Sequence, residues 1–123
     1  MIFDENNKAI YLQIADRICD EIVNGLYPAD SRLPSVRDYA ADVQVNANTV
    51  MRSYERLAQK EYIYNRRGIG FFVSPDARNK IIKERGDELI NEKLNSVFET
   101  LSHLDITPDA LRQAYITFLD SRR

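Results

Sequence analysis

The stretch RLPSVRDYAADVQVNANTV, Arg32 to Val50, places two short helical patterns back to back. Ser35 can cap the first pattern, and Asp38 three residues later can complete a capping box. After a tight connection, Asn46 can cap the second pattern. The stretch therefore predicts two short helices joined by a turn.

Helical spacing also continues on both sides of this stretch. Upstream, isoleucine recurs at every fourth position from Ile10 to Ile22, which predicts an amphipathic helix over residues 9–24 that stops at Gly25. Downstream, the helix opened by Asn46 is expected to run to about Lys60. Its predicted inward positions are Val50, Tyr54, Leu57 and Ala58.

The period then changes to that of strands. Residues 62–64 (YIY) and 71–73 (FFV) are β-branched and aromatic, and the loop NRRGIG separates them. Such a pair of runs around a glycine-bearing loop predicts a β-hairpin. Three helices followed by a two-stranded hairpin is the order of a winged helix-turn-helix, with the hairpin as the wing.

The composition describes a folded chain that has no membrane span. The 123 residues suit one domain, or one small domain plus an extension, and 44% of them are hydrophobic. No apolar run approaches the ~18–20 residues that cross a bilayer, and residues 1–5 do not resemble a secretory leader. With a single cysteine, the chain forms no internal disulfide. We expect a cytoplasmic protein without a membrane partner.

The charge distribution singles out the helix-turn-helix segment. The net charge is −2, yet residues 32–73 carry seven basic and four acidic side chains. If Val50, Tyr54 and Leu57 are buried, the outer side of the second helix carries a polar set of Asn48, Thr49, Arg52, Ser53 and Arg56. In the major groove, Arg can pair with guanine and Asn with adenine. Arg66 and Arg67 at the hairpin tip would meet the DNA backbone or the minor groove.

The motifs resemble those of the GntR family of bacterial transcription regulators. They read YLQI at 11–14, GLY at 25–27, LPSVR at 33–37, VNANTV at 45–50 and GIGFFV at 68–73, so that the resemblance covers residues 9–73. Asp30, Gln44 and Glu61 stand where the family pattern has glycine. Asp30 tolerates a left-handed turn, whereas Gln44 and Glu61 are candidates for an altered turn geometry.

The resemblance implies a set of DNA contacts in this chain. They would fall on Ser35, Arg37, Asn46, Asn48, Thr49, Arg52 and Gly68.

Each candidate also has a purely structural interpretation. Ser35 and Asn46 can be helix caps and nothing else. Arg52 can pair with Glu55 or Asp42 on a solvated face. The two arginines of the hairpin loop can simply keep an exposed edge soluble. The agreement of all these residues on one face of one arrangement favours DNA binding.

The remaining residues predict a helical tail. Ser74-Pro75-Asp76 starts a helix, and Gly86 allows a bend in it. Its apolar residues form a heptad seam of Ile90, Leu94, Val97, Leu101 and Leu104. Thr107-Pro108-Asp109 starts a second helix, whose apolar stripe includes Leu111, Tyr115 and Phe118.

Two helices alone cannot bury both stripes. A second copy of the chain is the simplest partner, although both helices could instead pack back on the winged domain. The expected architecture is mainly α with a small β-hairpin: a winged helix-turn-helix domain over 1–74 and a two-helix dimerisation domain over 75–123. This short tail resembles the YtrA subfamily of the GntR family, whose C-terminal part serves mainly for dimerisation. It offers little volume for a ligand, and the sequence identifies no effector.

An enzyme is not expected. His103 is the only histidine, no metal-ligand spacing is present, and GIG at 68–70 is too short for a dinucleotide fingerprint. No cofactor or metal is predicted. We expect a homodimeric repressor that binds a palindromic DNA operator. The alternative is a winged-helix protein-docking module, which would not need arginines and amides at the start of the recognition helix.

Overall fold

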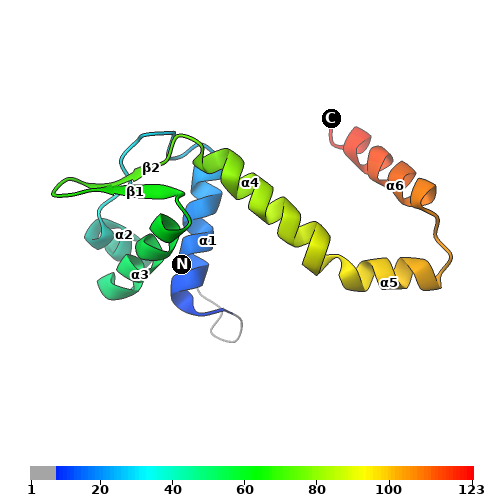
Figure 1. Cartoon of the computed structure of the whole chain (residues 1–123), viewed down its shortest axis with the longest axis horizontal. Coiled ribbons are helices and arrows are strands. Elements are labelled where there is room, and N and C mark those ends of the chain that lie inside the picture. Colours follow the sequence, from blue (N-terminus) through cyan, green and yellow to red (C-terminus); the bar gives the residue numbers. More distant parts are fainter. Residues whose placement is uncertain (1–7) are drawn as a thin grey trace. The chain divides into compact units, whose positions relative to one another are not determined.

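The computed structural model describes residues 8–123, so residues 1–5, which are not expected to form a secretory leader, lie outside the described part. Six α-helices, one π-helical turn and one hairpin follow one another in the described chain. They are α1 (Ile10–Val23), α2 (Val36–Val43), α3 (Ala47–Gln59), β1 (Ile63–Arg66), β2 (Gly70–Val73), α4 (Ala77–Glu88), η1 (Leu89–Lys93), α5 (Asn95–His103) and α6 (Pro108–Ser121). The predicted class, mainly helical with a small hairpin and a winged helix-turn-helix, is confirmed (Figure 1).

The chain forms two compact units, one ending at Glu84 and the other running from Arg85 to Arg123. The sequence places a domain boundary after Ser74, whereas the units divide within α4. The reason is that Ala77 and Ile81, in the first turns of α4, are buried in the core of the first unit. No helix in residues 8–123 has the length and apolar character needed to span a membrane.

The isoleucine stripe of α1 forms one side of the core. Ile14 and Ile18 have no exposed surface. At the end of the helix, Gly25 adopts φ +87°. The N–H of Leu26 donates to the carbonyl of Glu21 over 2.9 Å, and the N–H of Gly25 donates to the carbonyl of Ile22. These two bonds satisfy the last carbonyls of the helix, as predicted for a glycine stop.

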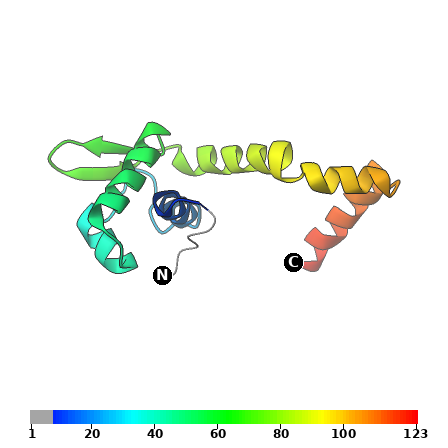
Figure 2. The same cartoon turned by 90° about the horizontal axis from the view of Figure 1, so that it is seen from below.

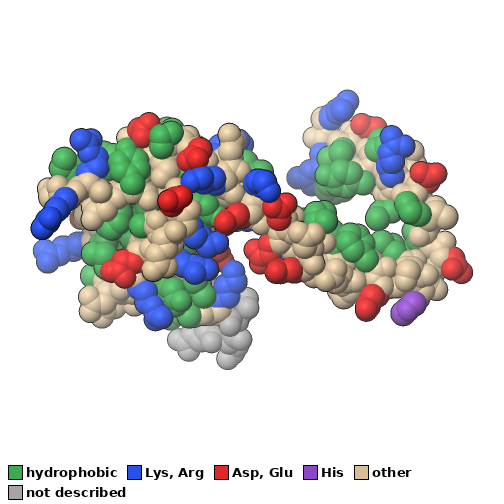
Figure 3. Space-filling model, in the orientation of Figure 1, with side chains coloured by type: hydrophobic (Ala, Val, Ile, Leu, Met, Phe, Trp, Pro, Cys, Tyr) green, Lys and Arg blue, Asp and Glu red, His purple; other side chains and the backbone are tan. Residues whose placement is uncertain are grey.

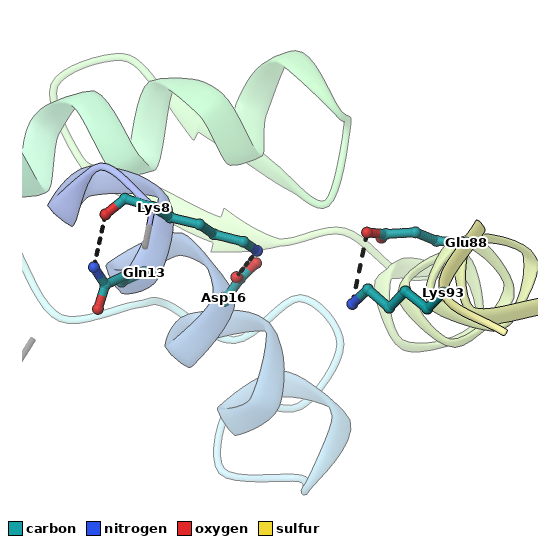
Figure 4. A network of polar contacts seen from close by, with 5 residues as sticks. All are labelled: Lys8, Gln13, Asp16, Glu88 and Lys93. Atoms are coloured by element: carbon teal, nitrogen blue, oxygen red, sulfur yellow. Dashed lines mark hydrogen bonds and ion pairs between the residues drawn. The ribbon is translucent and has the colours of Figure 1, made fainter. Parts of the chain in front are cut away.

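Near its start, α1 is tied to the segment before it. Lys8 Nζ lies 2.6 Å from the carboxylate of Asp16, and Gln13 Nε2 donates to the carbonyl of Lys8 over 2.8 Å (Figure 4). These contacts hold residues 8 and 9 against the first turns of α1.

The turn between α2 and α3 has the caps predicted from the sequence. The Oγ of Ser35 accepts a hydrogen bond from the N–H of Asp38, and the Oδ1 of Asn46 accepts one from the N–H of Asn48. Gln44, which ends α2, has φ +60°. The left-handed turn is therefore kept without glycine.

Buried tyrosines join the three helices. The hydroxyl of Tyr54 on α3 donates to the carbonyl of Pro34 over 2.7 Å, and that of Tyr39 on α2 donates to Glu21 on α1 over 2.7 Å. Burial, together with the hydrogen bond to Glu21, raises the pKa of Tyr39 far above its ordinary value, so that the hydroxyl remains a donor.

One expectation for α3 is wrong. Ser53 was assigned to the outer side of the helix, but it is completely buried. Its Oγ donates to the carbonyl of Tyr11 over 2.6 Å, with the carbonyl of Thr49 3.1 Å away. Position 53 is three residues after Val50 and four before Leu57, so it lies on the buried face of the helix even though its side chain is polar.

The hairpin pairs β1 and β2 antiparallel, with Ile63 opposite Val73 and Tyr64 opposite Phe72. Ile63 and Val73 face the core, whereas Tyr64 and Phe72 stack on the other face with ring centroids 5.7 Å apart. Both views in Figures 1 and 2 show the hairpin turn projecting beyond α2 and α3. The core therefore anchors the base of the hairpin and leaves its tip free of the three helices.

The first helix of the tail does not bend at Gly86, the position where the sequence allows a bend. α4 passes through Gly86 without interruption, and the irregularity comes after it, in the π-helical turn η1. The N–H of Leu94 donates to the carbonyl of Leu89 over 3.0 Å, and Glu88 and Lys93 form an ion pair of 3.6 Å across this turn (Figure 4). A π-turn adds a residue to the helical repeat, so the heptad seam changes phase between Ile90 and Leu94. The predicted cap at Thr107 is confirmed by its bond from the N–H of Ala110.

Candidate nucleic-acid interface

The first turn of α3 presents polar side chains outward. Asn48 and Arg52 are exposed and Thr49 is half-buried, whereas Val50 and Tyr54 have no exposed surface. The apolar stripe fixes the rotation of the helix about its axis, so the amide and guanidinium groups lie on the side away from the core. This is the geometry on which the predicted reading surface depends.

Arg52 is held by the start of α1. Its guanidinium carbon lies 3.9 Å from the ring centroid of Tyr11, a close cation–π contact. The buried bond from Ser53 to the carbonyl of Tyr11 fixes the same two helices next to this stack. The expected alternative, in which Arg52 pairs with Glu55 or Asp42, does not occur among the ion pairs of residues 8–123.

The stack borders a shallow depression on the surface of the first unit. Its lining comes from the start of α1 and the start of α3: Ala9, Ile10, Tyr11, Asn48, Thr49 and Arg52. Three of the predicted DNA-contacting residues thus share one hollow. Tyr11 was not among the predicted site residues, although it begins the YLQI motif, because only the packing of α1 against α3 brings it to Arg52.

The α2 candidates lie close in sequence to this surface. Arg37 is exposed in the first turn of α2, and Ser35 caps that helix. The prediction that Ser35 and Asn46 cap helices is confirmed, since both side chains accept a hydrogen bond from the first turn of their helix. Their caps also define two helix N-termini, where unpaired N–H groups and the helix dipole favour an anion such as phosphate.

The wing carries the remaining candidates at its tip. Arg66, Arg67 and Gly68 are all exposed, and Gly68 has φ +79° with open space around it. The guanidinium of Arg66 leans back over the ring of Phe72, 5.4 Å from its centroid. Figure 3 shows blue basic side chains gathered along the edge of the first unit that carries the hairpin. In residues 8–123 no group of three His, Cys, Asp or Glu side chains is arranged to hold a metal ion.

The predicted dimerisation residues are accessible in the second unit. Leu94 and Leu101 are half-buried, and the others are exposed: Ile90, Val97, Leu104, Leu111, Tyr115 and Phe118. Green hydrophobic side chains are visible on the surface of this unit in Figure 3.

Comparison with known proteins identifies the family. The family profile described as bacterial regulatory proteins, gntR family, matches residues 10–73. The chain is 35% identical over 117 residues to YhcF of Bacillus subtilis (strain 168), an uncharacterized HTH-type transcriptional regulator, with 94% of each chain covered. It is also 30% identical over 88 residues to the HTH-type transcriptional repressor YtrA of the same strain. This match covers 72% of this chain and 67% of YtrA.

Solved structures agree with these relatives. A crystal structure assigned to the GntR family from Bacteroides thetaiotaomicron is 48% identical, has a TM-score of 0.82 and covers 94% of this chain and 100% of its own. YtrA from Sulfolobus acidocaldarius, a GntR-family transcription factor, is 26% identical with a TM-score of 0.57, and the match covers 75% of this chain and 97% of that one. The similarity to the first of these runs through both compact units. The family profile spans α1 to β2, and these relatives are regulators rather than enzymes. This chain therefore belongs to the GntR family of transcriptional regulators, is YtrA-like, and carries the DNA-binding winged helix-turn-helix of that family.

Proposed function

We propose that the protein is a homodimeric repressor that recognises a palindromic DNA operator. The observation that carries the proposal is the outward face of α3, where Asn48, Thr49 and Arg52 stand exposed or half-exposed above a buried apolar stripe. A helix with this face fits the major groove, where each bidentate pairing of Arg or Asn with a base contributes about 1–3 kcal/mol of discrimination.

The proposed contacts divide by chemistry. Asn48, Thr49 and Arg52 read base edges, with Arg52 held in position by Tyr11. Arg37 and the capped starts of α2 and α3, at Ser35 and Asn46, hold phosphates. At the wing, the contacts to the backbone or the minor groove come from Arg66, Arg67 and Gly68.

The dimer is proposed from the exposed apolar faces of the tail. A palindromic operator then follows from the symmetry, because two copies of α3 would read half-sites about one helical turn, ~34–36 Å, or a multiple of it apart. The YtrA and NagR proteins of Bacillus subtilis (strain 168), both similar to this chain, are named as repressors. A small dimer on its operator can block polymerase without further parts. Such a protein would work in the cytoplasm, where the chromosome lies.

The test begins with selection of bound fragments from random duplex DNA, followed by mobility shifts at several salt concentrations. Arg52→Ala should lose about tenfold or more in affinity for the selected duplex and relax its preference at one base pair. Arg37→Ala should weaken all duplexes alike and lower the salt dependence, because it removes a phosphate contact.

A matched control removes an arginine from the second unit. Arg112→Ala loses the same charge and should bind the selected duplex as the parent does. If Arg37→Ala and Arg52→Ala also bound as tightly as the parent with the same salt slope, the DNA face would be wrongly placed. If the parent selected no sequence at all, the winged domain would act as a docking module for another protein.

A further inference from the structure

The outer face of the wing gathers side chains that the sequence did not bring together. In the hairpin register Tyr64 lies opposite Phe72 and Arg66 lies opposite Gly70, and these four residues alternate with the core-facing ones. Arg32, far earlier in the chain, pairs with Phe72 through an isolated antiparallel bridge. Opposite residues of antiparallel strands point to the same face, so Arg32 joins this outer face from a third strand-like segment.

The side chain of Arg32 lies over Gly70. A Cβ atom at position 70 would stand 3.0 Å from Nε and 3.3 Å from Nη2 of Arg32, closer than side chains normally approach. Gly70 also has φ +146°, which favours glycine. At Gly70 no side chain separates the backbone of β2 from the guanidinium of Arg32.

A second arginine lies beside this point, and its guanidinium lies over Phe72, the residue whose backbone pairs with Arg32. Arg66 is the direct partner of Gly70 across the hairpin, so its backbone flanks the spot that the guanidinium of Arg32 occupies. Neither arginine forms an ion pair within residues 8–123. The nearby carboxylate of Asp30 accepts a hydrogen bond from the hydroxyl of Tyr64 over 3.0 Å. Two arginines on one face of the hairpin, neither with an ion-pair partner among these residues, favour an anion that binds both of them.

We propose that Arg32 and Arg66 form an anion seat on the outer face of the wing that takes one phosphate of the DNA backbone. The inference rests on the proposed function, because α3 and the wing tip bring the duplex to this face. Both arginines are exposed, so a free anion would be held by two groups in water. A phosphate that belongs to an already docked duplex binds at a high effective concentration. Arg32 is then a backbone contact that carries no base information.

The test is the salt dependence of binding to the selected duplex by full-length protein. Arg32→Gln should bind about tenfold more weakly at 0.1 M salt and lower the log–log salt slope by about 0.9 per bound subunit, with unchanged base preference. Arg32→Lys should keep the slope, since it keeps the charge. Arg112→Gln, the matched control in the second unit, should match the parent in both affinity and slope.

A duplex series in which single phosphates are replaced by uncharged methylphosphonates locates the contact. At one position the neutral linkage should weaken the parent as much as Arg32→Gln does, and should not weaken Arg32→Gln further. An unchanged slope in Arg32→Gln, or an equal loss of slope in Arg32→Lys, would overturn the seat.

The same experiment separates this inference from the proposed function. A parent that selects no DNA sequence contradicts the function itself. A parent that selects a sequence, with an Arg32→Gln variant identical to it in slope, contradicts the seat alone.

Discussion

The two compact units differ in where they keep their hydrophobic side chains. In the first unit the isoleucines of α1, the tyrosines of α2 and α3, and Ile63 and Val73 of the hairpin enclose one another. In the second unit η1, α5 and α6 contain no buried residue, and aromatic side chains such as Tyr115 and Phe118 are more than half exposed. The first unit can bury its core within one chain. The second unit leaves its apolar side chains exposed, and this difference is the basis for the proposal that the first unit recognises DNA and the second associates with another copy.

The largest effect on assembly and DNA affinity is expected when charges are placed among the apolar side chains of the second unit. Leu94→Asp combined with Leu101→Asp should convert the protein from dimer to monomer in sedimentation, because two carboxylates would have to be buried at the seam. Affinity for the full operator should fall by about a hundredfold or more, since the second half-site loses its effective concentration. Thermal unfolding of the first unit should not change.

The matched control adds the same two charges to polar positions of α5, as Asn95→Asp with Ser102→Asp. This variant should remain a dimer and bind the operator as the parent does. A dimer that persisted in the leucine variant would show that the seam lies elsewhere, and the contrast between the two units would lose its functional meaning.

The second prediction compares equivalent deletions in the two units. Ile18→Ala removes a side chain with no exposed surface and should destabilise the first unit by about 2–5 kcal/mol. Leu104→Ala removes a side chain that is 65% exposed in the single chain and should leave the unfolding of the first unit unchanged. Chemical denaturation followed by tyrosine fluorescence measures both. Equal losses in the two variants would mean that Leu104 is part of one shared core.

The elements of the first unit follow from the sequence because each has a local cause. The isoleucine period defines α1, side-chain caps define the starts of α2 and α3, and the alternation after residue 62 defines the hairpin. Gln44 and Glu61, both candidates for an altered turn, keep φ values of +60° and +61°. At these positions the surrounding packing sets the backbone and overrides the local preference of the residue.

What the sequence could not predict depends on packing between elements. The burial of Ser53 and the stack of Arg52 on Tyr11 both require the rotation of α1 against α3, which no periodic pattern reports. The π-turn could not be predicted for another reason. Leu89 and Ile90 are both apolar, so the pattern fits two helical phases equally well, and an added residue leaves no mark in it.

The smallest prediction tests the backbone strain at exposed left-handed turns of the first unit. A residue with a Cβ atom in the left-handed region costs about 1–2 kcal/mol relative to the right-handed one, and glycine avoids this cost while losing some chain entropy on folding. Gln44→Gly should therefore stabilise the protein by about 1 kcal/mol, which raises the melting temperature by about 4–8 °C for a unit of this size. Gln44→Ala keeps the Cβ atom and should bring no such gain.

Glu61→Gly should gain less than Gln44→Gly, even though the two backbones have nearly the same φ. The carboxylate of Glu61 lies 3.7 Å from Lys80 Nζ on α4, and an exposed pair of this kind contributes about 0–1 kcal/mol that the glycine variant would lose. Differential scanning calorimetry of the three variants gives the order directly. A gain in Gln44→Ala equal to that in Gln44→Gly would place the effect in the side chain of glutamine rather than in the left-handed turn.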